Sequence, residues 1–405
     1  MRRIDLSEYQ RSEPYRLSVA ERNALKVALP SLTIEPASDT TYAYHLTPGS
    51  TVGAFEVGDL SVLVRPKIKI PQLLSLACYA MSGLRLRDES FDYPDEYALP
   101  DVLALSLSSA AARAFSRGLL HGYRTEEEAL HGVRGRIMFD EQIRRRFGIA
   151  VPVEVSYDEF TDDILANRLV KAAAHRLGQL RPRTSQARNA LGRVAGTLDN
   201  VTLVSFPSRD VPDVRLDRLN VHYGEVIALS RLILRHGAYE SGRGAVRASG
   251  FLMDMNVIFQ EFATVALRES LGISDDSVFG ERNIRSLDTS GKVHLRPDLT
   301  WWEGSHCVFV GDVKYKNLTG RAVPNSDIYQ LLAYSTALDL PGGLLVYAKD
   351  EAEARIYHVR HSSAVLEVAA LDISGTLNQA LARVELLADK VRALRSRAPR
   401  KHRAA

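Results

Sequence analysis

The chain has few cysteines. Its 405 residues include only two, Cys78 and Cys307, which lie far apart in apolar surroundings. Two such cysteines form neither a disulfide framework nor a zinc site, and no group of His and Cys residues has zinc spacing. We therefore expect a reducing, cytoplasmic setting.

Long apolar runs are also missing. None reaches the roughly 18 residues that span a bilayer, and the first residues, Met1 to Asp5, lack the apolar stretch of a signal peptide. The sequence thus predicts no membrane partner.

A nucleotide-binding P-loop is absent as well. The pattern Gly-x-x-x-x-Gly-Lys-Ser/Thr does not occur, because the pair Gly291-Lys292 has Ser286 in place of the first glycine and is followed by Val293. Any motion driven by nucleotide hydrolysis must then come from a partner.

The overall composition is that of an ordinary globular protein, with 45% hydrophobic residues, 25% charged residues and a net charge of +3. The length allows two or three domains. The charge is compatible with nucleic-acid binding without arguing for it. Positive charge gathers in residues 390–405, which carry Lys390, Arg392, Arg395, Arg397, Arg400, Lys401 and Arg403. This basic tail could contact phosphate, or it could be a disordered end that only aids solubility.

The apolar pattern predicts an α/β (α+β) multidomain fold. Residues 1–100 are β-rich, with strands at 51–57 and 60–64 around the turn Gly58-Asp59 and a helix at about 72–81. Residues 101–240 are mainly helical. Helical segments are expected there at 103–120, at 126–130, from a cap at Asp162-Asp163 to about 180, and at 219–234.

A break at Glu240 to Gly244 precedes the last domain, residues 245–389. Its apolar pattern differs from that of the middle region. The expected elements are a helix at 251–271, strands at 278–284, 293–301 and 306–315, a helix at 327–338, and strands at 344–348 and 355–359.

Two aspartates and a lysine lie on the paired strands of this last domain. Asp298 follows Pro297, and Asp312 and Lys314 are two residues apart, so on a strand both side chains point to one face. The apolar run 307–311 indicates a strand buried on both faces. Charge at the end of such a strand is costly unless it is paired or holds a metal, which suggests a catalytic site. Pro297 removes a ladder donor, so we expect its strand to be bulged there or to lie at an edge.

These residue types suit phosphodiester hydrolysis. The carboxylates of Asp298 and Asp312, with the Val313 carbonyl, are the hard oxygen ligands that Mg²⁺ prefers. The metal would neutralise charge that develops at the phosphate. Lys314 would orient or deprotonate the attacking water, although two nearby acids favour its protonated form.

Further candidates lie on the flanking segments. Glu261, on the helix before the strands, is a candidate third acid and metal ligand. Gln330 and Tyr334 share one helix face and are candidates for contact with the DNA backbone or with an ordered water. Lys316 is a candidate phosphate contact. The alternatives are a solvated glutamate, a solvated lysine, and a core tyrosine with glutamine at its rim.

Together these residues resemble the PD-(D/E)xK signature of restriction-endonuclease-like domains, with the Gln-x-x-x-Tyr element of the RecB-like branch. The wider chain resembles the McrC family, the nuclease subunits of McrBC-type modification-dependent restriction systems. This resemblance covers roughly residues 50–350. It rests on segments 52–55, 65–68, 133–137, 157–168, 251–262, 296–298 and 312–316.

The resemblance implies a division of labour. A McrC-like chain supplies an Mg²⁺-dependent endonuclease, and a hexameric AAA+ GTPase, McrB, recognises modified (methylcytosine-type) double-stranded DNA and translocates. The amino-terminal region would bind this GTPase and stimulate it. The missing P-loop agrees with such a division.

Two other functions stay open. One is a stand-alone RecB-like nuclease in repair or phage defence, which the large non-nuclease half disfavours. The other is a regulatory adaptor whose main role is to stimulate a partner NTPase, which the intact Asp298, Asp312 and Lys314 disfavour.

Overall fold

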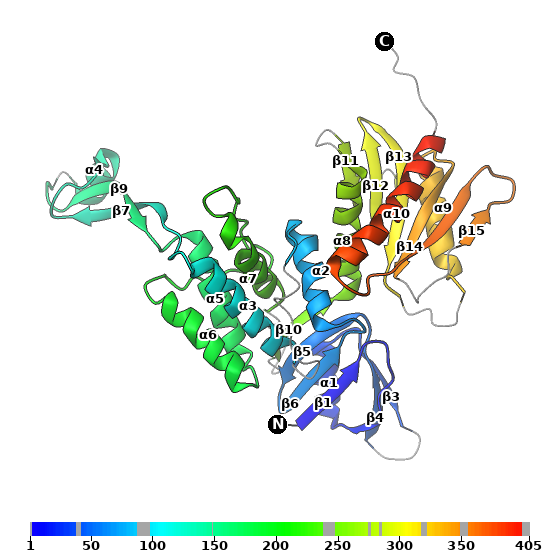
Figure 1. The fold of residues 1–405 in the computed structure, drawn as a ribbon, viewed down its shortest axis with the longest axis horizontal. Coiled ribbons are helices and arrows are strands. Elements are labelled where there is room, and N and C mark those ends of the chain that lie inside the picture. The colour runs from blue at the N-terminus through cyan, green and yellow to red at the C-terminus, as the bar shows by residue number, and fades with distance from the viewer. Residues whose placement is uncertain are drawn as a thin grey trace, which may run out of the picture. The chain divides into compact units, whose positions relative to one another are not determined.

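A computed structural model describes residues 2–37, 42–86, 98–147, 149–237, 248–273, 277–282, 286–316, 322–348 and 355–398. The chain divides into two compact units (Figure 1): Met1–Leu99 with Tyr239–Ala405, and Pro100–Ala238. Along the sequence, the second unit is an insertion in the first. The break expected at Glu240 to Gly244 lies outside the described residues.

The two segments that flank the inserted unit meet in one sheet of the first unit. This four-stranded sheet contains, in spatial order, β1 (Arg2–Ser7), β6 (Leu60–Arg65), β5 (Thr51–Val57) and β10 (Ala248–Asp254). Strands β5 and β6 form the expected hairpin, which confirms that prediction, and β10 pairs antiparallel with β5. The regions that the sequence analysis treats as separate first and last domains are therefore joined in one unit.

The β5–β10 pair depends on glycine. A Cβ at Gly53 would lie 2.0 Å from the carbonyl oxygen of Phe251, and a Cβ at Gly250 would lie 2.4 Å from the Cβ of Phe55. Gly53 also has a φ of 134°, which other residues rarely adopt. The backbones of β5 and β10 can approach this closely only because both positions are glycine.

Helix α8 (Met255–Leu271) begins four residues later than expected. Residues 251–254 belong to β10, and Asp254 caps the helix by accepting a 2.9 Å hydrogen bond from the Asn256 N–H. The Ser50 hydroxyl donates to the same Asp254 oxygen. The pairing with β5, which a helical apolar pattern does not reveal, decides where the helix starts.

The remaining amino-terminal elements form a small sheet and two helices. The sheet contains, in order, β2 (Tyr15–Arg16), β4 (Ala43–Thr47) and β3 (Thr33–Pro36). The helices are α1 (Val19–Ala28), which starts at a capping box of Ser18 and Glu21, and α2 (Ile70–Ser82), which ends at Gly83 in the left-handed region.

A six-stranded mixed sheet forms the rest of the first unit (Figure 1). Its strands, in order, are β11 (Ser277–Gly280), β12 (Leu299–Glu303), β13 (His306–Lys314), β14 (Gly342–Ala348), β16 (Val365–Leu371) and β15 (Arg355–His358). Strand β13 pairs antiparallel with β12 and parallel with β14. Helix α9 (Asn325–Ala337) packs on β14 and β13, while α8 and α10 (Leu377–Arg397) pack on each other and also contact β13.

Helix α10 corrects the expected disordered tail. A capping box of Thr376 and Gln379 starts the helix, and a stripe of buried apolar residues from Leu377 to Leu394 holds it to the sheet. The basic residues from Lys390 to Arg397 are therefore helical. The Arg395 guanidinium lies 4.6 Å from the centre of the Trp301 ring. Residues 399–405 lie outside the described part.

The second unit combines helices with a small sheet. Its helices are α3 (Leu99–Phe115), α4 (Phe139–Arg146), α5 (Leu165–Gln179), α6 (Ser185–Thr197), the 3-10 turn η2 (Val221–Tyr223) and α7 (Gly224–His236). The sheet contains, in order, β7 (Gly122–Leu130), β9 (Val153–Thr161) and β8 (Arg136–Ile137). Within the described ranges of both units, no helix is long and apolar enough to span a membrane.

Strand β7 replaces the helical turn expected at 126–130. Its acidic run has helical propensity, but cross-strand partners on β9 override that preference. The Thr125 hydroxyl donates to Asp158, and the Tyr157 hydroxyl donates to Glu128. A single sequence does not show these pairs, because they join residues about thirty positions apart.

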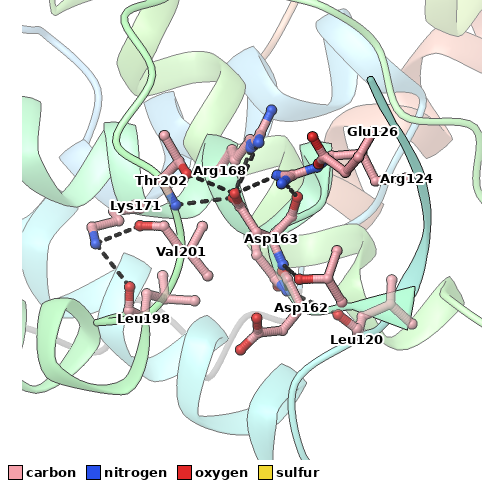
Figure 2. A network of polar contacts seen from close by, with 12 residues as sticks. Leu120, Arg124, Glu126, Asp162, Asp163, Arg168, Lys171, Leu198, Val201 and Thr202 are labelled. Atoms are coloured by element: carbon pink, nitrogen blue, oxygen red, sulfur yellow. Dashed lines mark hydrogen bonds and ion pairs between the residues drawn. The ribbon is translucent and has the colours of Figure 1, made fainter. Parts of the chain in front are cut away.

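Asp163 is the centre of a buried polar network in the second unit, which Figure 2 shows. Its carboxylate accepts hydrogen bonds from Arg124 at 2.5 Å, from Arg168 at 2.7 and 2.9 Å, and from the N–H and hydroxyl of Thr202 at 2.9 and 2.6 Å. The side chain therefore joins β7, α5 and the segment after α6. It does not cap α5, whose N-cap is Ile164, so the expected capping role was wrong.

The hydrogen bonds of Arg168 hold the pKa of Asp163 far below its ordinary value, and they outweigh the opposing effect of burial. The two arginines keep the carboxylate charged in the folded chain. Their own pKa values are raised by this same carboxylate.

Replacing Asp163 by Asn should lower the free energy of unfolding by about 3 kcal/mol at neutral pH, the usual cost of breaking a buried ion pair. Because the folded pKa is depressed, this stabilisation is complete above the ordinary carboxyl pKa of about 4 and shrinks as the pH falls below it. Differential scanning calorimetry of the full-length chain between about pH 7 and pH 3 measures both effects.

Asp162→Asn is the matched control. Asp162 contributes its backbone carbonyl, which accepts a 2.6 Å hydrogen bond from Asn167. Its substitution should change the free energy of unfolding by less than about 0.5 kcal/mol. Equal effects of the two substitutions, or an Asp163→Asn effect that is as large at pH 3 as at pH 7, would contradict the prediction.

Candidate functional site

The site lies at the carboxyl end of β13, the strand shared by the antiparallel and parallel parts of the six-stranded sheet. Asp312 is 1% exposed, and its Oδ2 lies 2.5 Å from the Nζ of Lys314, whose side chain is 18% exposed. Alternation along the strand places both side chains on one face, as expected. The register with β14 puts them beside Leu345 and Tyr347, which pack on Leu331 of α9. The ion pair therefore lies on the face of the sheet that α9 covers.

Asp298 is held next to this pair by the backbone of β13. The N–H of Val313 donates a 2.9 Å hydrogen bond to Asp298 Oδ2. The β12–β13 register pairs Leu299 with Gly311, so Asp298 comes just before the first paired residue of its strand. The structure thus brings together Asp298, Asp312 and Lys314, the three residues that the sequence analysis selected.

Pro297 lies neither at a sheet edge nor at a bulge, contrary to the prediction. Strand β12 is an inner strand, and its register shift lies between Trp301 and Trp302. Pro297 lies ahead of Leu299, the first residue of β12, so the ladder needs no N–H from it. The strand needs neither an edge position nor a bulge at the proline.

Burial dominates the electrostatics of the site. Burial, and secondly the Asp298 carboxylate, raise the pKa of Asp312 to about 7, although Lys314 acts in the opposite direction. Burial alone would lower the pKa of Lys314, but Asp312 and Asp298 more than offset it, so that the Lys314 pKa lies above its ordinary value. The lysine is therefore a stable cation beside a carboxylate that is costly to ionise.

The donor set fits a hard divalent cation. Asp312 Oδ1 is buried and has no hydrogen-bond partner among the described residues. The Val313 N–H points toward Asp298, and in an extended strand the carbonyl of the same residue points to the same side. Two carboxylates and one carbonyl therefore converge from two neighbouring segments. A cation there would satisfy the buried oxygen and reduce the repulsion between the aspartates.

Glu261 is not part of this convergence. It lies on α8, and its side chain is exposed. Among the described residues, no three His, Cys, Asp or Glu side chains gather closely enough to hold a metal ion. The role of Glu261 as a third ligand stays a prediction.

Gln330 and Tyr334 contact each other on α9, as their spacing predicts. Together they bind the backbone carbonyl of Arg296. Gln330 Nε2 donates a 2.6 Å hydrogen bond to the Tyr334 hydroxyl, which donates at 3.2 Å to the Arg296 carbonyl. Tyr334 is only 2% exposed, so its ring belongs to the core. This differs from the expected contact with DNA. The tyrosine secures the segment that leads into Asp298, whereas a DNA contact by Gln330 stays a prediction.

Lys316 is fixed by residues that the sequence analysis missed. Its Nζ donates at 2.7 and 2.9 Å to the carboxylate of Asp327 on α9, and the Tyr347 hydroxyl donates to the same carboxylate. Burial would raise the pKa of Asp327, but Lys316 and Tyr347 hold it below its ordinary value. An acid in the first turn of a helix is common, so the sequence carries no signal for this role. Contact of Lys316 with phosphate also stays a prediction.

The fold and site together define an α/β protein with a carboxylate–lysine site at the end of a central strand. A family model described as McrBC 5-methylcytosine restriction system component matches residues 46–348. The chain belongs to this family, which confirms the resemblance found in the sequence.

Two relatives illustrate the similarity. The type IV methyl-directed restriction enzyme EcoKMcrBC of Escherichia coli (strain K12) is 22% identical over 306 residues, which cover 70% of this chain and 86% of that protein. A chain in the solved half-complex of Thermococcus gammatolerans McrB AAA+ hexamers with bound McrC is 18% identical, with a TM-score of 0.59. That match covers 96% of this chain and 100% of the other, and it supports the fold alone.

Replacing Tyr334 by Phe should lower the free energy of unfolding by about 1 kcal/mol, because the Arg296 carbonyl and Gln330 lose a partner while the ring stays buried. Urea denaturation followed by tryptophan fluorescence measures this change. Both tryptophans of the chain, Trp301 and Trp302, lie in β12, close to the affected segment.

Tyr329→Phe is the control for this substitution. Tyr329 is on the same helix and is 65% exposed, so removing its hydroxyl should have little effect. A loss at Tyr334 no larger than the loss at Tyr329 would show that the buried hydroxyl does not hold the Arg296 segment.

Proposed function

We propose that the chain is the endonuclease subunit of a McrBC-like restriction complex that defends against foreign DNA. It hydrolyses phosphodiester bonds of modified (methylcytosine-type) double-stranded DNA, requires Mg²⁺ and acts with an AAA+ GTPase ring that it stimulates. The observation that carries this proposal is the meeting of Asp298, Asp312 and Lys314 at the end of β13. This arrangement supports a nuclease site of the PD-(D/E)xK type.

Each residue has a distinct part in the proposed reaction. Asp298 and Asp312, with the Val313 carbonyl, would hold the cation. When bound, Mg²⁺ would offset the charge that develops on the phosphate and would lower the pKa of a coordinated water. Lys314 keeps its proton, since both aspartates raise its pKa, so its part is to hold a phosphate oxygen or the attacking water. A role as general base would require loss of that proton.

The proposed partner follows from the family and from the absent P-loop. The T. gammatolerans relative of similar fold was solved as McrC bound to McrB AAA+ hexamers. The present sequence has no nucleotide-binding P-loop, so it needs a separate source of GTP hydrolysis. We infer that the first unit supplies the nuclease site to such a ring.

Asp298→Asn, Asp312→Asn and Lys314→Met should each lower the rate of DNA cleavage by the reconstituted complex about 100-fold or more, because the aspartates would hold the cation and Lys314 would hold a phosphate oxygen or the attacking water. Plasmid cleavage measures this rate. GTPase stimulation, measured in the same samples, should persist, because the substitutions leave other surfaces intact.

Glu385→Gln on the exposed side of α10 controls for loss of a charge and should cleave as the wild type does. Cleavage of plasmid with Mg²⁺ by the purified chain alone would instead support a stand-alone nuclease. Full cleavage by the Asp312→Asn complex would refute the assigned site.

Metal binding gives a test that does not depend on activity. With about 10 mM MgCl₂ and a dissociation constant near 1 mM, binding should stabilise the chain by about 1.4 kcal/mol, a rise in Tm of roughly 2–4 °C. Calorimetry against an EDTA-treated sample measures the shift. The double substitution of Asp298 and Asp312 by Asn should abolish it.

Glu261→Gln tests, in the same measurement, whether Glu261 is a metal ligand. A reduced shift would add Glu261 to the metal ligands, and an unchanged shift would exclude it. An Mg²⁺ shift of equal size in the double variant would contradict the metal assignment.

A further inference from the structure

The first unit contains a hollow that is lined by none of the candidate site residues. Its volume is about 470 Å³, within the range of small-molecule sites. It lies where the starts of α2 and α10 meet, and these two helices contact each other (Figure 1). The lining residues used below are Lys67, Lys69, Gln72, Ser75, Gly375 and Thr376.

Two helix amino termini converge on this hollow. Helix α2 has 13 residues and α10 has 21, so each has a developed dipole with its positive end at the hollow. Neither first turn contains an acidic residue. The N-cap of α2, Lys69, makes no side-chain capping bond. Gln72 Nε2 donates to the Ile373 carbonyl and thereby ties the start of α2 to the segment before α10.

Ser75 supplies an unused donor inside the hollow. It is 5% exposed and lines the hollow, and its hydroxyl has no hydrogen-bond partner among the described residues. Other buried helical serines of this chain behave differently: Ser230 and Ser335 donate to the carbonyl one turn earlier, at 2.7 and 2.9 Å. Helical side chains lean toward the amino terminus, so the Ser75 hydroxyl is directed toward the first turn of α2.

The charges around the hollow favour an anion. Lys67 and Lys69 line it, and the Lys67 ammonium lies 4.9 Å from the centre of the Tyr9 ring. The nearby Asp372 carboxylate accepts hydrogen bonds from the N–H and hydroxyl of Ser374 and forms an ion pair with Arg383. The Glu8 carboxylate accepts hydrogen bonds from the Lys67 N–H at 3.1 Å and from the Tyr315 hydroxyl at 3.3 Å. Both acids near the hollow therefore have partners of their own.

We propose that this hollow binds a phosphate group. Two helix dipoles, two lysines and a buried hydroxyl are the features that recognise a tetrahedral oxyanion. The phosphate comes either from the DNA backbone or from a free phosphate compound. In the first case the site is an additional contact for the substrate and rests on the proposed function. In the second case it is independent of that function.

Calorimetric titration of the full-length chain with inorganic phosphate, in EDTA and at constant ionic strength, tests the proposal. Phosphate should bind, and Lys69→Gln and Ser75→Ala should each weaken binding about tenfold, since each removes one donor to a charged oxygen. Alanine is well tolerated in helices, so Ser75→Ala should fold.

Two controls separate this site from general charge effects and from catalysis. Lys26→Gln, on the exposed side of α1, removes an equal charge and should bind phosphate as the wild type does. Asp312→Asn should also bind phosphate normally, whatever its effect on cleavage. No phosphate binding by the wild type, or equal binding by all variants, would overturn the proposal.

Binding of an unmodified DNA duplex distinguishes the two sources of the phosphate, the DNA backbone and a free phosphate compound. Fluorescence anisotropy in EDTA measures binding of the duplex without cleavage. If the site holds backbone phosphate, Lys69→Gln and Ser75→Ala should weaken duplex binding, and inorganic phosphate should compete with the duplex. If the site holds a free phosphate compound, the duplex should bind all variants equally while the phosphate titration still distinguishes them.

Discussion

The pairing of β10 with β5 is the contact on which the first unit depends. It adds residues 248–254 to a sheet built from residues 2–65, and it does so across an inserted unit of more than a hundred residues. Gly53 and Gly250 permit the close approach of the two backbones. At the end of this pair Asp254 caps α8, which then packs on α2 and on β13. The first and last segments of the chain therefore share one folding unit, which contains β13, the strand with the candidate site.

Ionisation of Asp312 in the candidate site is electrostatically unfavourable, and the surrounding structure holds the two aspartates together despite this cost. Asp312 is buried at the end of a central strand, and burial together with Asp298 raises its pKa to about 7. The backbone N–H of Val313 and the hydroxyl of Tyr334 hold the Asp298 segment in place despite the repulsion. A buried carboxylate whose pKa is raised in this way is common at catalytic centres, and under the proposed function a cation would relieve the cost of ionising it. The hollow at the starts of α2 and α10 has the opposite character in our proposal, because two helix amino termini and two lysines line it.

Local patterns predicted the elements whose signals are contained within a few residues. The β5–β6 hairpin, the β12–β13 pair and the helix α9 follow from alternation, turns and helical spacing, and all three are present, although β12 begins at Leu299 and not at the expected residue 293. The errors have a common cause. Strand β7 has helical composition but pairs with β9, and residues 251–254 match a helical pattern but pair with β5. The last turns of α10, residues 390–397, fall in the predicted basic tail, because their charges hide the apolar stripe that packs on the sheet.

The sequence by itself determined the family and the choice of Asp298, Asp312 and Lys314, because residue type and a spacing of two along a strand already place two of them on one face. Tertiary structure decided what surrounds them. The tie from Tyr334 to Arg296, the pairing of Lys316 with Asp327 and the exposed position of Glu261 depend on how α8 and α9 pack on the sheet. Such contacts join residues that are distant along the chain, and their energies arise only when packing removes water from between them.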